Sequence, residues 1–168
     1  HLTKLGHQSA VVSAGGGLTE QLSDHGAKHF SLPIAKKNFL AIKQYKNLRD
    51  IYREFKPDII HVRSRFPAWI NVLALKGLSS SKPIVISTFH GLYSKPFYSK
   101  SMSYANDIIA ISKTVQEYVF KNYDVDHSRV HLIYRGCDID EFNTSAPSEA
   151  WSNSWYKEFP QTSDKILL

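Results

Sequence analysis

Several residues that could bind an anionic ligand stand directly after apolar stretches of this sequence. His90 and Gly91 follow the stretch 83–89, and Arg63 and Arg65 follow the letters DIIHV. A histidine can donate a hydrogen bond, accept one or change its charge near neutral pH. An arginine offers a planar set of donors that suits phosphate or carboxylate groups. These residue types predict a ligand site with His90 as its catalytic candidate. A structural hydrogen bond at a strand end is the other reading of His90.

Four further positions belong to the same candidate set. Gly15 and Gly16 lie in a run of three glycines, which lets the backbone approach a ligand closely. The run does not match the dinucleotide pattern GxGxxG, and a plain flexible turn is the alternative. Ser112 and Arg135 follow two later apolar stretches. For the arginines, the competing interpretation is a solvated loop end in a basic protein.

The pair Arg63 and Arg65 has a spacing that suits a single anion. Residues two apart in an extended chain point the same way, so both guanidinium groups could reach one ligand. Ser64, between them, could instead cap a following helix.

Patterns of several other catalytic classes are absent. The chain has no CxxC or HExxH pair for a metal, no GxSxG turn for a serine hydrolase and no Walker GxxxxGK(S/T) loop. Its eight histidines are scattered. We therefore predict neither a metal site nor a bound cofactor. The single cysteine, Cys137, excludes an internal disulfide framework and fits a reducing cytoplasm.

Short apolar stretches alternate with longer stretches of helical periodicity, which is the signature of βαβ units and a parallel sheet. We expect strands at 8–14, 29–34, 58–64, 83–89, 107–112 and 129–135. We expect helices at 38–55, 68–78, 99–105 and 113–123. The later strands are apolar throughout, so helices should cover both faces of the sheet. Pro33 suggests an edge position for the second strand.

The two ends of the chain have patterns of their own. Residues 1–6 are typical of the last turns of a helix, with Gly6 just after its end. Residues 138–154 are polar and predict a loop. Residues 164–168 begin what we expect to be a new apolar strand.

The predicted helix at 38–55, with Asn38 as its N-cap and Pro57 after its end, is strongly basic. Its basic residues are Lys43, Lys46, Arg49 and Arg53. A basic amphipathic helix can lie on an anionic membrane surface. An ordinary helix with a solvated face is the alternative.

Length and composition limit the class of protein. A chain of 168 residues with 42% hydrophobic residues can form a real core and is not typical of a disordered protein. The net charge of +6 favours polyanionic neighbours. The basic residues are dispersed and no recognition motif accompanies them, so we do not predict a nucleic-acid binder. No apolar run approaches the roughly 20 residues that cross a bilayer. We expect a cytoplasmic protein, with peripheral contact at the inner face of the membrane.

Four segments, taken in this order, resemble the N-terminal half of bacterial glycosyltransferases of family 4, which are two-domain GT-B enzymes. They are PDIIHVRSRFPAW (57–69), TFHG (88–91), DIIAISKTVQEYV (107–119) and VHLIYRGCDIDEF (130–142). The likeness is greatest to transferases of lipopolysaccharide and other surface polysaccharides. It implies a Rossmann-like α/β domain at 1–142, with helices on both faces of a parallel sheet. At 143–168 it implies a linker and the first strand of a nucleotide-sugar-binding domain.

The resemblance also implies a role for each candidate residue. His90 would lie in the interdomain cleft near the transferred sugar, and Arg63 and Arg65 in a segment that binds the acceptor. Ser112 and Arg135 would line the inner rim and the hinge. The implied enzyme is a retaining hexosyltransferase that moves a sugar from a nucleotide-sugar to a cell-envelope glycan or glycolipid without a metal. A non-catalytic Rossmann-like or flavodoxin-like module for an anionic ligand remains the alternative.

The sequence departs from the family pattern at both ends. The family's first strand has no counterpart before His1, and its second domain has none after Leu168. That strand normally lies between the strands expected here at 8–14 and 58–64, so its absence leaves two unpaired edges. We therefore expect a split or rearranged sheet, or pairing with another chain through these edges. We also expect the fragment to be inactive alone.

Overall fold

The computed structural model describes residues 1–34, 39–78, 82–93, 96–140 and 146–162. The chain forms two compact units, His1–Tyr134 and Arg135–Leu168. Each is described by itself, and the domain boundary predicted after residue 142 stays a prediction. Asn38 and the strand predicted at 164–168 lie outside the described residues.

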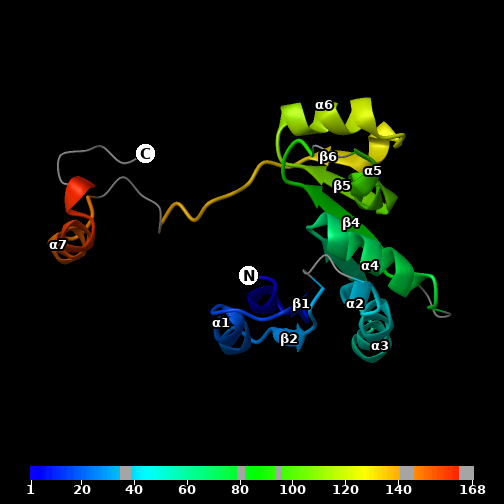
Figure 1. Ribbon diagram of the computed structural model, residues 1–168, viewed down its shortest axis with the longest axis horizontal. Helices are drawn as coiled ribbons and strands as arrows, with labels where there is room; N and C mark the ends of the chain where they lie inside the picture. The colour runs from blue at the N-terminus through cyan, green and yellow to red at the C-terminus, as the bar shows by residue number, and fades with distance from the viewer. Residues whose placement is uncertain (35–38, 79–81, 94–95, 141–145, 163–168) are drawn as a thin grey trace. The chain divides into compact units, whose positions relative to one another are not determined.

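The first unit contains two parallel sheets rather than one (Figure 1). The smaller sheet pairs β1 (Ala10–Ser13) with β2 (Lys28–Ser31). The larger sheet has the order β3-β4-β5-β6, with β3 at Ile59–Val62, β4 at Ile84–Phe89, β5 at Asp107–Ala110 and β6 at Val130–Leu132. Among the described residues no strand joins β1 to β3. The split sheet expected from the sequence is therefore confirmed, and β2 lies at an edge as Pro33 suggested.

Helices connect the strands of the first unit. They are α1 (Thr19–Asp24), α2 (Phe39–Ile42), α3 (Tyr45–Phe55), α4 (Arg65–Leu75), α5 (Pro96–Ser99) and α6 (Lys113–Asn122). Short 3-10 turns are η1 (Thr3–Leu5), η2 (Lys100–Tyr104) and η3 (His127–Arg129). The parallel four-stranded sheet flanked by helices confirms the predicted Rossmann-like α/β class.

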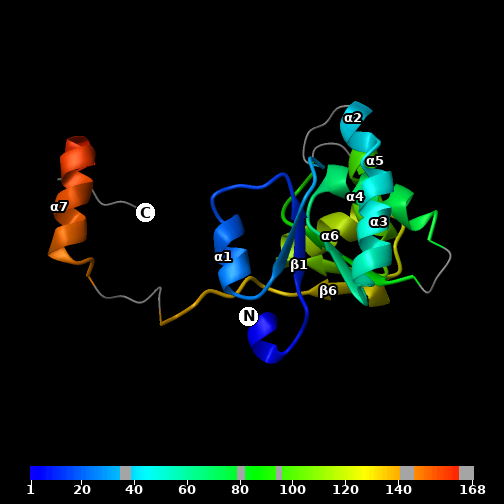
Figure 2. The same ribbon diagram turned by 90° about the horizontal axis from the view of Figure 1, so that it is seen from below.

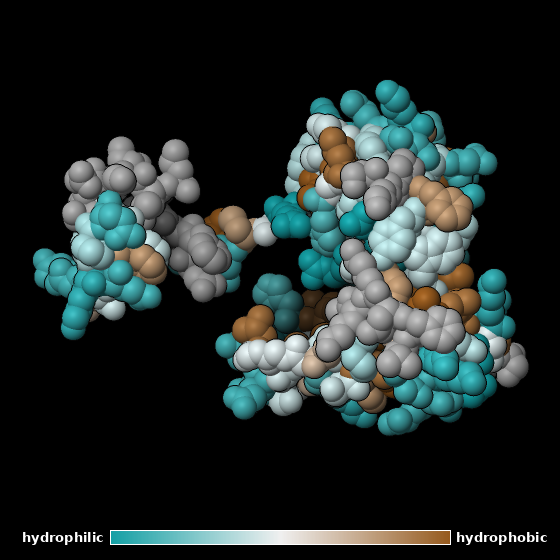
Figure 3. All heavy atoms as spheres, viewed as in Figure 1, coloured by the Kyte–Doolittle hydropathy of each residue, from teal (hydrophilic) through white to brown (hydrophobic). Residues whose placement is uncertain are grey.

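The main hydrophobic core lies between the larger sheet and its helices. Phe89, Met102, Ile108 and Val119 have no exposed surface there. Side chains alternate along each strand, so Val62 of β3 faces this core whereas Ile59 is 57% exposed. Figure 3 shows the apolar side chains that remain on the visible surface as scattered groups among hydrophilic ones.

A second, smaller core connects the two sheets through helices. Leu32, just after β2, packs with Leu48 of α3 and Ile70 of α4, and Val12 of β1 lies against the same cluster. Helix α3 runs beside α4 (Figure 2). The two-stranded sheet is thus held by helix packing where the continuous strand ladder is interrupted.

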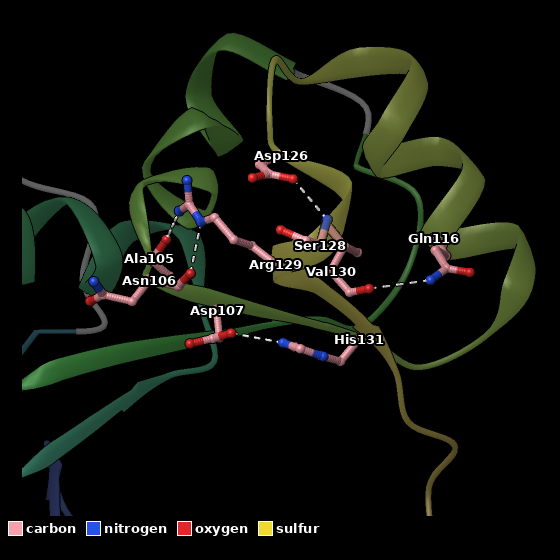
Figure 4. Close-up of polar contacts among 9 residues, drawn as sticks. All are labelled: Ala105, Asn106, Asp107, Gln116, Asp126, Ser128, Arg129, Val130 and His131. Atoms are coloured by element: carbon pink, nitrogen blue, oxygen red, sulfur yellow. Dashed lines mark hydrogen bonds and ion pairs between the residues drawn. The ribbon is translucent and has the colours of Figure 1, made fainter.

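Hydrogen bonds hold the short edge strand β6 against β5 (Figure 4). Arg129 donates to the carbonyls of Asn106, at 2.8 Å from Nε, and of Ala105. Beyond it, His131 Nε2 lies 2.7 Å from Asp107 Oδ1. Strand β6 has only three residues, so these side-chain contacts extend a pairing that its backbone alone would leave short.

The end regions differ in part from the sequence-based expectations. Gly6 follows the turn η1 with φ 84°, as expected for a residue just after a helix. The prediction of a loop at 138–154 is wrong from residue 149 onward, because α7 (Glu149–Glu158) begins there. This helix is followed by η4 (Pro160–Thr162). Ser148 caps this helix by accepting from the Trp151 N–H at 3.3 Å. The rings of Trp151 and Trp155, one turn apart, stack at 5.5 Å.

The predicted helix at 38–55 is interrupted between α2 and α3, and one of its basic residues turns inward. Arg49 donates from Nε to the carbonyl of Ala74 and from Nη2 to that of Leu73, both at 3.0 Å. These carbonyls belong to the last turn of α4, where helical partners run out and the helix dipole favours a cation. Arg49 therefore caps α4 and is not part of a solvated basic face.

We predict that Arg49 and Gly77 act on stability as a pair. Arg49→Met should lower the free energy of unfolding by about 2 kcal/mol, since charged hydrogen bonds to carbonyls are lost. A methyl group at Gly77 would overlap the Arg49 guanidinium, so Gly77→Ala should cost a similar amount. In the Arg49→Met background, Gly77→Ala should cost less than about 0.5 kcal/mol. Urea unfolding of the four proteins measures the coupling, and additive losses would contradict it.

Candidate functional site

The larger sheet brings several predicted site residues to one edge. Its strands are parallel, with Val62 opposite Ser87 and Phe89 opposite Ala110. The carboxyl ends of β3, β4 and β5 therefore lie side by side, and the loops that follow them meet there. Arg63 and His90 come directly after β3 and β4, and Ser112 follows the last residue of β5 by two positions.

Arg65 reaches from α4 to the loop that follows β4. Its guanidinium carbon lies 4.8 Å from the ring centre of Tyr93 and 5.2 Å from that of Tyr98. The Arg65 carbonyl accepts from Ser101 Oγ at 3.0 Å. Both the backbone and the side chain of Arg65 are thus fixed, and the guanidinium is held near the His90 loop.

His90 is partly buried and its loop is anchored on aromatic residues. The His90 N–H donates to the Tyr93 hydroxyl at 3.4 Å. Phe89, the residue before it, is fully buried and packs against Tyr93 and Tyr123, with ring centres 5.2 and 5.4 Å away. Burial and the neighbouring Tyr118 hydroxyl raise the pKa of Tyr123 to about 12. The Tyr123 side chain, which packs against Phe89, therefore stays neutral at physiological pH.

Gly91 and Ser112 have different relations to this edge. The backbone of Gly91 is not in the left-handed region, and a methyl group there would meet nothing within 4 Å. Its own backbone therefore gives no steric reason for glycine. Ser112 caps α6, since its Oγ accepts from the Val115 N–H at 3.2 Å. The helix N-terminus that Ser112 caps follows β5 at the same sheet edge.

The two arginines do not share one extended segment, contrary to the premise that paired them. Ser64 is extended, but Arg65 is already the first residue of α4, so the period-two alternation stops before it. Ser64 stands at the N-cap position without a side-chain capping bond. Arg63 is exposed and lies close enough to His61 to affect its pKa. Convergence of Arg63 and Arg65 on one anion stays a prediction.

His61 and Thr88 form a pair that the sequence did not suggest. The position of His61 inside the apolar stretch DIIHV predicts a hydrogen-bonded core residue. It is hydrogen-bonded, with 2.6 Å between its Nε2 and Thr88 Oγ1, but it lies on a partly exposed sheet face. Burial, and then the Arg63 charge, lower the pKa of His61 from its ordinary value of 6.5. The sequence position of His61, two residues before Arg63, was the one sign in the sequence that the arginine could affect this histidine.

We predict that His61 makes the unfolding free energy of this unit depend on pH. The unfolded chain binds a proton at this residue at higher pH than the folded chain does, because the folded-state pKa is lowered. Stability present above pH 6.5 is therefore lost as the pH falls towards the folded-state pKa. His61→Gln should flatten this slope between pH 7 and 5. Equal slopes for wild type and His61→Gln would contradict the lowered pKa.

The glycine run lies in a different pocket. Gly15 and Gly16 have φ of 94° and 149° and turn the chain from β1 into α1. With β1, α1 and η1 they line a largely apolar groove of about 820 Å³, which does not include His90 or the arginines. A ligand contact by Gly15 and Gly16 stays a prediction. Arg135 begins the second unit, so its placement relative to His90 stays a prediction.

A second pocket, of about 520 Å³, lies at the opposite end of the strands. It is lined by Phe97, Lys100, Ser103, Tyr104, Asn122, Tyr123, Asp124 and Arg129. None of the predicted site residues belongs to it. The strand-end cluster around His90 and Arg65 is therefore the candidate site, and Tyr93 and Tyr98 are the residues of it that the sequence did not single out.

Comparison with known proteins decides the family. The model of a family described as Glycosyltransferase Family 4 matches residues 1–141. The chain belongs to glycosyltransferase family 4. A search of curated proteins gives no significant match.

Solved structures agree with this family 4 assignment. A glycosyltransferase from Rickettsia africae ESF-5 is 28% identical, with a TM-score of 0.73, over 97% of this chain and 44% of its own. Anabaena HepE, solved with UDP and glucose, is 15% identical with a TM-score of 0.62, over 90% and 42%. The lipopolysaccharide outer core galactosyltransferase WaaB is 15% identical with a TM-score of 0.58, over 85% and 50%. The last two show the fold alone, and this chain spans half or less of each.

The described part of this family 4 chain has neither a metal-binding cluster nor a membrane-spanning helix. Among the residues that the structure describes, no three His, Cys, Asp or Glu side chains are grouped so that they could hold a metal ion. The helices described there are all too short or too polar to cross a bilayer.

Proposed function

We propose that this chain is the acceptor-side half of a retaining, metal-independent glycosyltransferase. The enzyme moves a sugar, a hexose, from a nucleotide-sugar to a glycan or glycolipid of the cell envelope. The observation that carries the proposal is the family match over residues 1–141 of a chain whose His90 and Arg65 lie at one strand-end edge. Ligands bind at this edge in open α/β sheets.

The structural neighbours support the choice of substrates. HepE was solved with UDP and glucose, and WaaB is a galactosyltransferase of the lipopolysaccharide outer core. A nucleoside diphosphate-hexose as donor and an envelope glycolipid as acceptor agree with both. The net charge of +6 favours such anionic molecules.

Each residue of the candidate site has a proposed task. His90 hydrogen-bonds the sugar that is transferred, and Arg65 and Arg63 hold hydroxyl or phosphate groups of the acceptor. In the reaction, the bond between the sugar carbon C1 and the diphosphate breaks, and a new bond forms from C1 to an acceptor oxygen. The proton of the acceptor hydroxyl leaves with the nucleoside diphosphate. Since the chain spans half or less of the solved relatives, we propose that it is inactive by itself.

Two contacts with other molecules complete the proposal. Lys46 of α3 is exposed and suits a peripheral contact with anionic lipid at the inner face of the membrane, although Arg49 is used internally. Within the described residues β1 pairs with β2 alone and β3 with β4 alone, and we propose the other edges of β1 and β3 as sites at which a second copy of the chain could add a strand.

A transfer assay on the complete enzyme tests this function. The enzyme is incubated with UDP-glucose or UDP-galactose labelled in the sugar and with a truncated lipopolysaccharide acceptor, with and without EDTA. We expect labelled glycolipid in both conditions, with the anomeric configuration of the donor kept in the NMR spectrum of the product. Inversion would overturn the retaining mechanism, and loss of transfer in EDTA would overturn metal independence. No transfer to any envelope acceptor would overturn the function.

A further inference from the structure

We propose that Tyr93 is a positioning residue that connects His90 and Arg65, so that one side chain sets the geometry of both. The inference rests on the proposed function for the roles of His90 and Arg65. It does not rest on it for the contacts, which belong to the loop that follows β4.

The hydroxyl of Tyr93 acts on His90. It accepts a hydrogen bond from the His90 backbone N–H at 3.4 Å. A tyrosine three residues later that accepts from this N–H closes the turn through Gly91 and limits the backbone conformations open to His90. The imidazole is thereby carried on a restrained backbone at the end of β4.

The ring of Tyr93 acts on Arg65. The guanidinium carbon lies 4.8 Å from the ring centre, within the range of a cation–π contact. Tyr98 provides a second ring at 5.2 Å. An arginine between two rings keeps its charge while losing most of its rotamer freedom, so it is ready to meet an anionic or hydroxylated group.

Further contacts fix Tyr93 itself. The Tyr118 hydroxyl of α6 donates to the Tyr93 carbonyl. The Tyr93 ring packs on Phe89, which is fully buried, with ring centres 5.2 Å apart. Tyr98 is held as well, since its carbonyl accepts from Trp69 Nε1 at 2.8 Å. The loop is therefore supported by α4, α6 and the core, and Tyr93 is the residue of it that contacts both functional groups.

The two contacts use different parts of one side chain and can be separated by substitution. Tyr93→Phe removes the hydroxyl but keeps the ring, so it should disturb His90 alone. Tyr98→Leu removes the other ring over Arg65 and should disturb Arg65 alone. Tyr93→Leu removes both contacts. Tyr45→Leu is the matched control, because Tyr45 stacks on Arg49 at 5.2 Å in α3.

Steady-state kinetics of the complete enzyme give the first test. We expect Tyr93→Phe to lower kcat about fivefold at an unchanged acceptor KM, the effect of one neutral hydrogen bond. Tyr98→Leu should raise the acceptor KM about fivefold at an unchanged kcat. Tyr93→Leu should change both, and Tyr45→Leu neither by more than about twofold. If Tyr93→Phe leaves kcat unchanged, or lowers it only in proportion to the folded fraction, the positioning role is overturned.

NMR of the complete enzyme, labelled with 15N-histidine or 15N-arginine, separates this inference from the proposed function. Tyr93→Phe should shift the His90 amide and speed its hydrogen exchange about tenfold, a loss of protection of the size expected for one hydrogen bond. It should leave the Arg65 Nε signal in place, and Tyr93→Leu should move both. These signals need no substrate, so an enzyme without transferase activity would still decide the role of Tyr93. Unchanged His90 exchange in Tyr93→Phe would overturn the inference.

Discussion

Replacing His90 by alanine in the complete enzyme should lower kcat about 100-fold to 1,000-fold, because the proposed function has His90 hydrogen-bond the transferred sugar and alanine cannot do so. The imidazole stands at the end of β4 on a partly buried residue, while the core contacts of this segment are made by Phe89. The free energy of unfolding should therefore change by less than about 1 kcal/mol. Initial rates at saturating donor and acceptor, with urea unfolding of the same samples, measure the two effects.

His131→Ala is the matched control for this experiment. His131 lies on β6 of the same sheet and pairs with Asp107 at 2.7 Å, with both side chains more than two-fifths exposed. An exposed pair of this kind contributes at most about 1 kcal/mol to stability, and its loss should leave kcat unchanged. If His90→Ala lowers the folded fraction as much as it lowers turnover, His90 is the structural hydrogen-bonder of the alternative reading.

Phe89→Ala should have the largest effect on stability. We expect it to lower the free energy of unfolding by about 3–5 kcal/mol, the cost of truncating a buried phenylalanine in a packed core. Phe89 has no exposed surface, and its ring lies between those of Tyr93 and Tyr123. A loss of that size is a large part of the total free energy of unfolding of a domain, which is about 5–15 kcal/mol. Urea unfolding followed by circular dichroism is the measurement.

The control for Phe89→Ala is Phe97→Ala. Phe97 is of the same type and follows eight residues later in α5, but it is 83% exposed, so its loss should change stability by no more than about 0.5 kcal/mol. Equal effects at the two positions would contradict the placement of the core. Phe89→Leu, which keeps part of the volume, should lose clearly less than Phe89→Ala.

Much of the fold could be predicted from local sequence patterns. The apolar stretches at 83–89 and 107–112 are β4 and β5, within two residues at each end. Such strands can be predicted from sequence because a strand that is covered on both faces is apolar along its whole length. The split into two sheets could also be predicted, because the family resemblance supplies no strand to join the stretches at 8–14 and 58–64. Helix α7 was missed because its signal, the Ser148 cap and two tryptophans, lies inside a polar stretch.

The candidate site was predictable in part. His90 and Arg65 could be placed at one edge because parallel strands align their carboxyl ends. Gly15 and Gly16 were grouped with them on the same argument, and the structure puts them in a separate groove beside α1. Position after a strand therefore identifies the edge but not the pocket, since β1 belongs to a different sheet from β4.

The sequence by itself determined the class of fold, the family and the loop that carries His90, because each follows from the order of residues along short segments. Only the tertiary structure decided where the side chains go. Arg65 lies over Tyr93 and Tyr98, and Arg49 caps α4 rather than facing solvent. Both outcomes depend on partners 24 or more residues away, brought near by helix packing. No spacing within a segment encodes those distances.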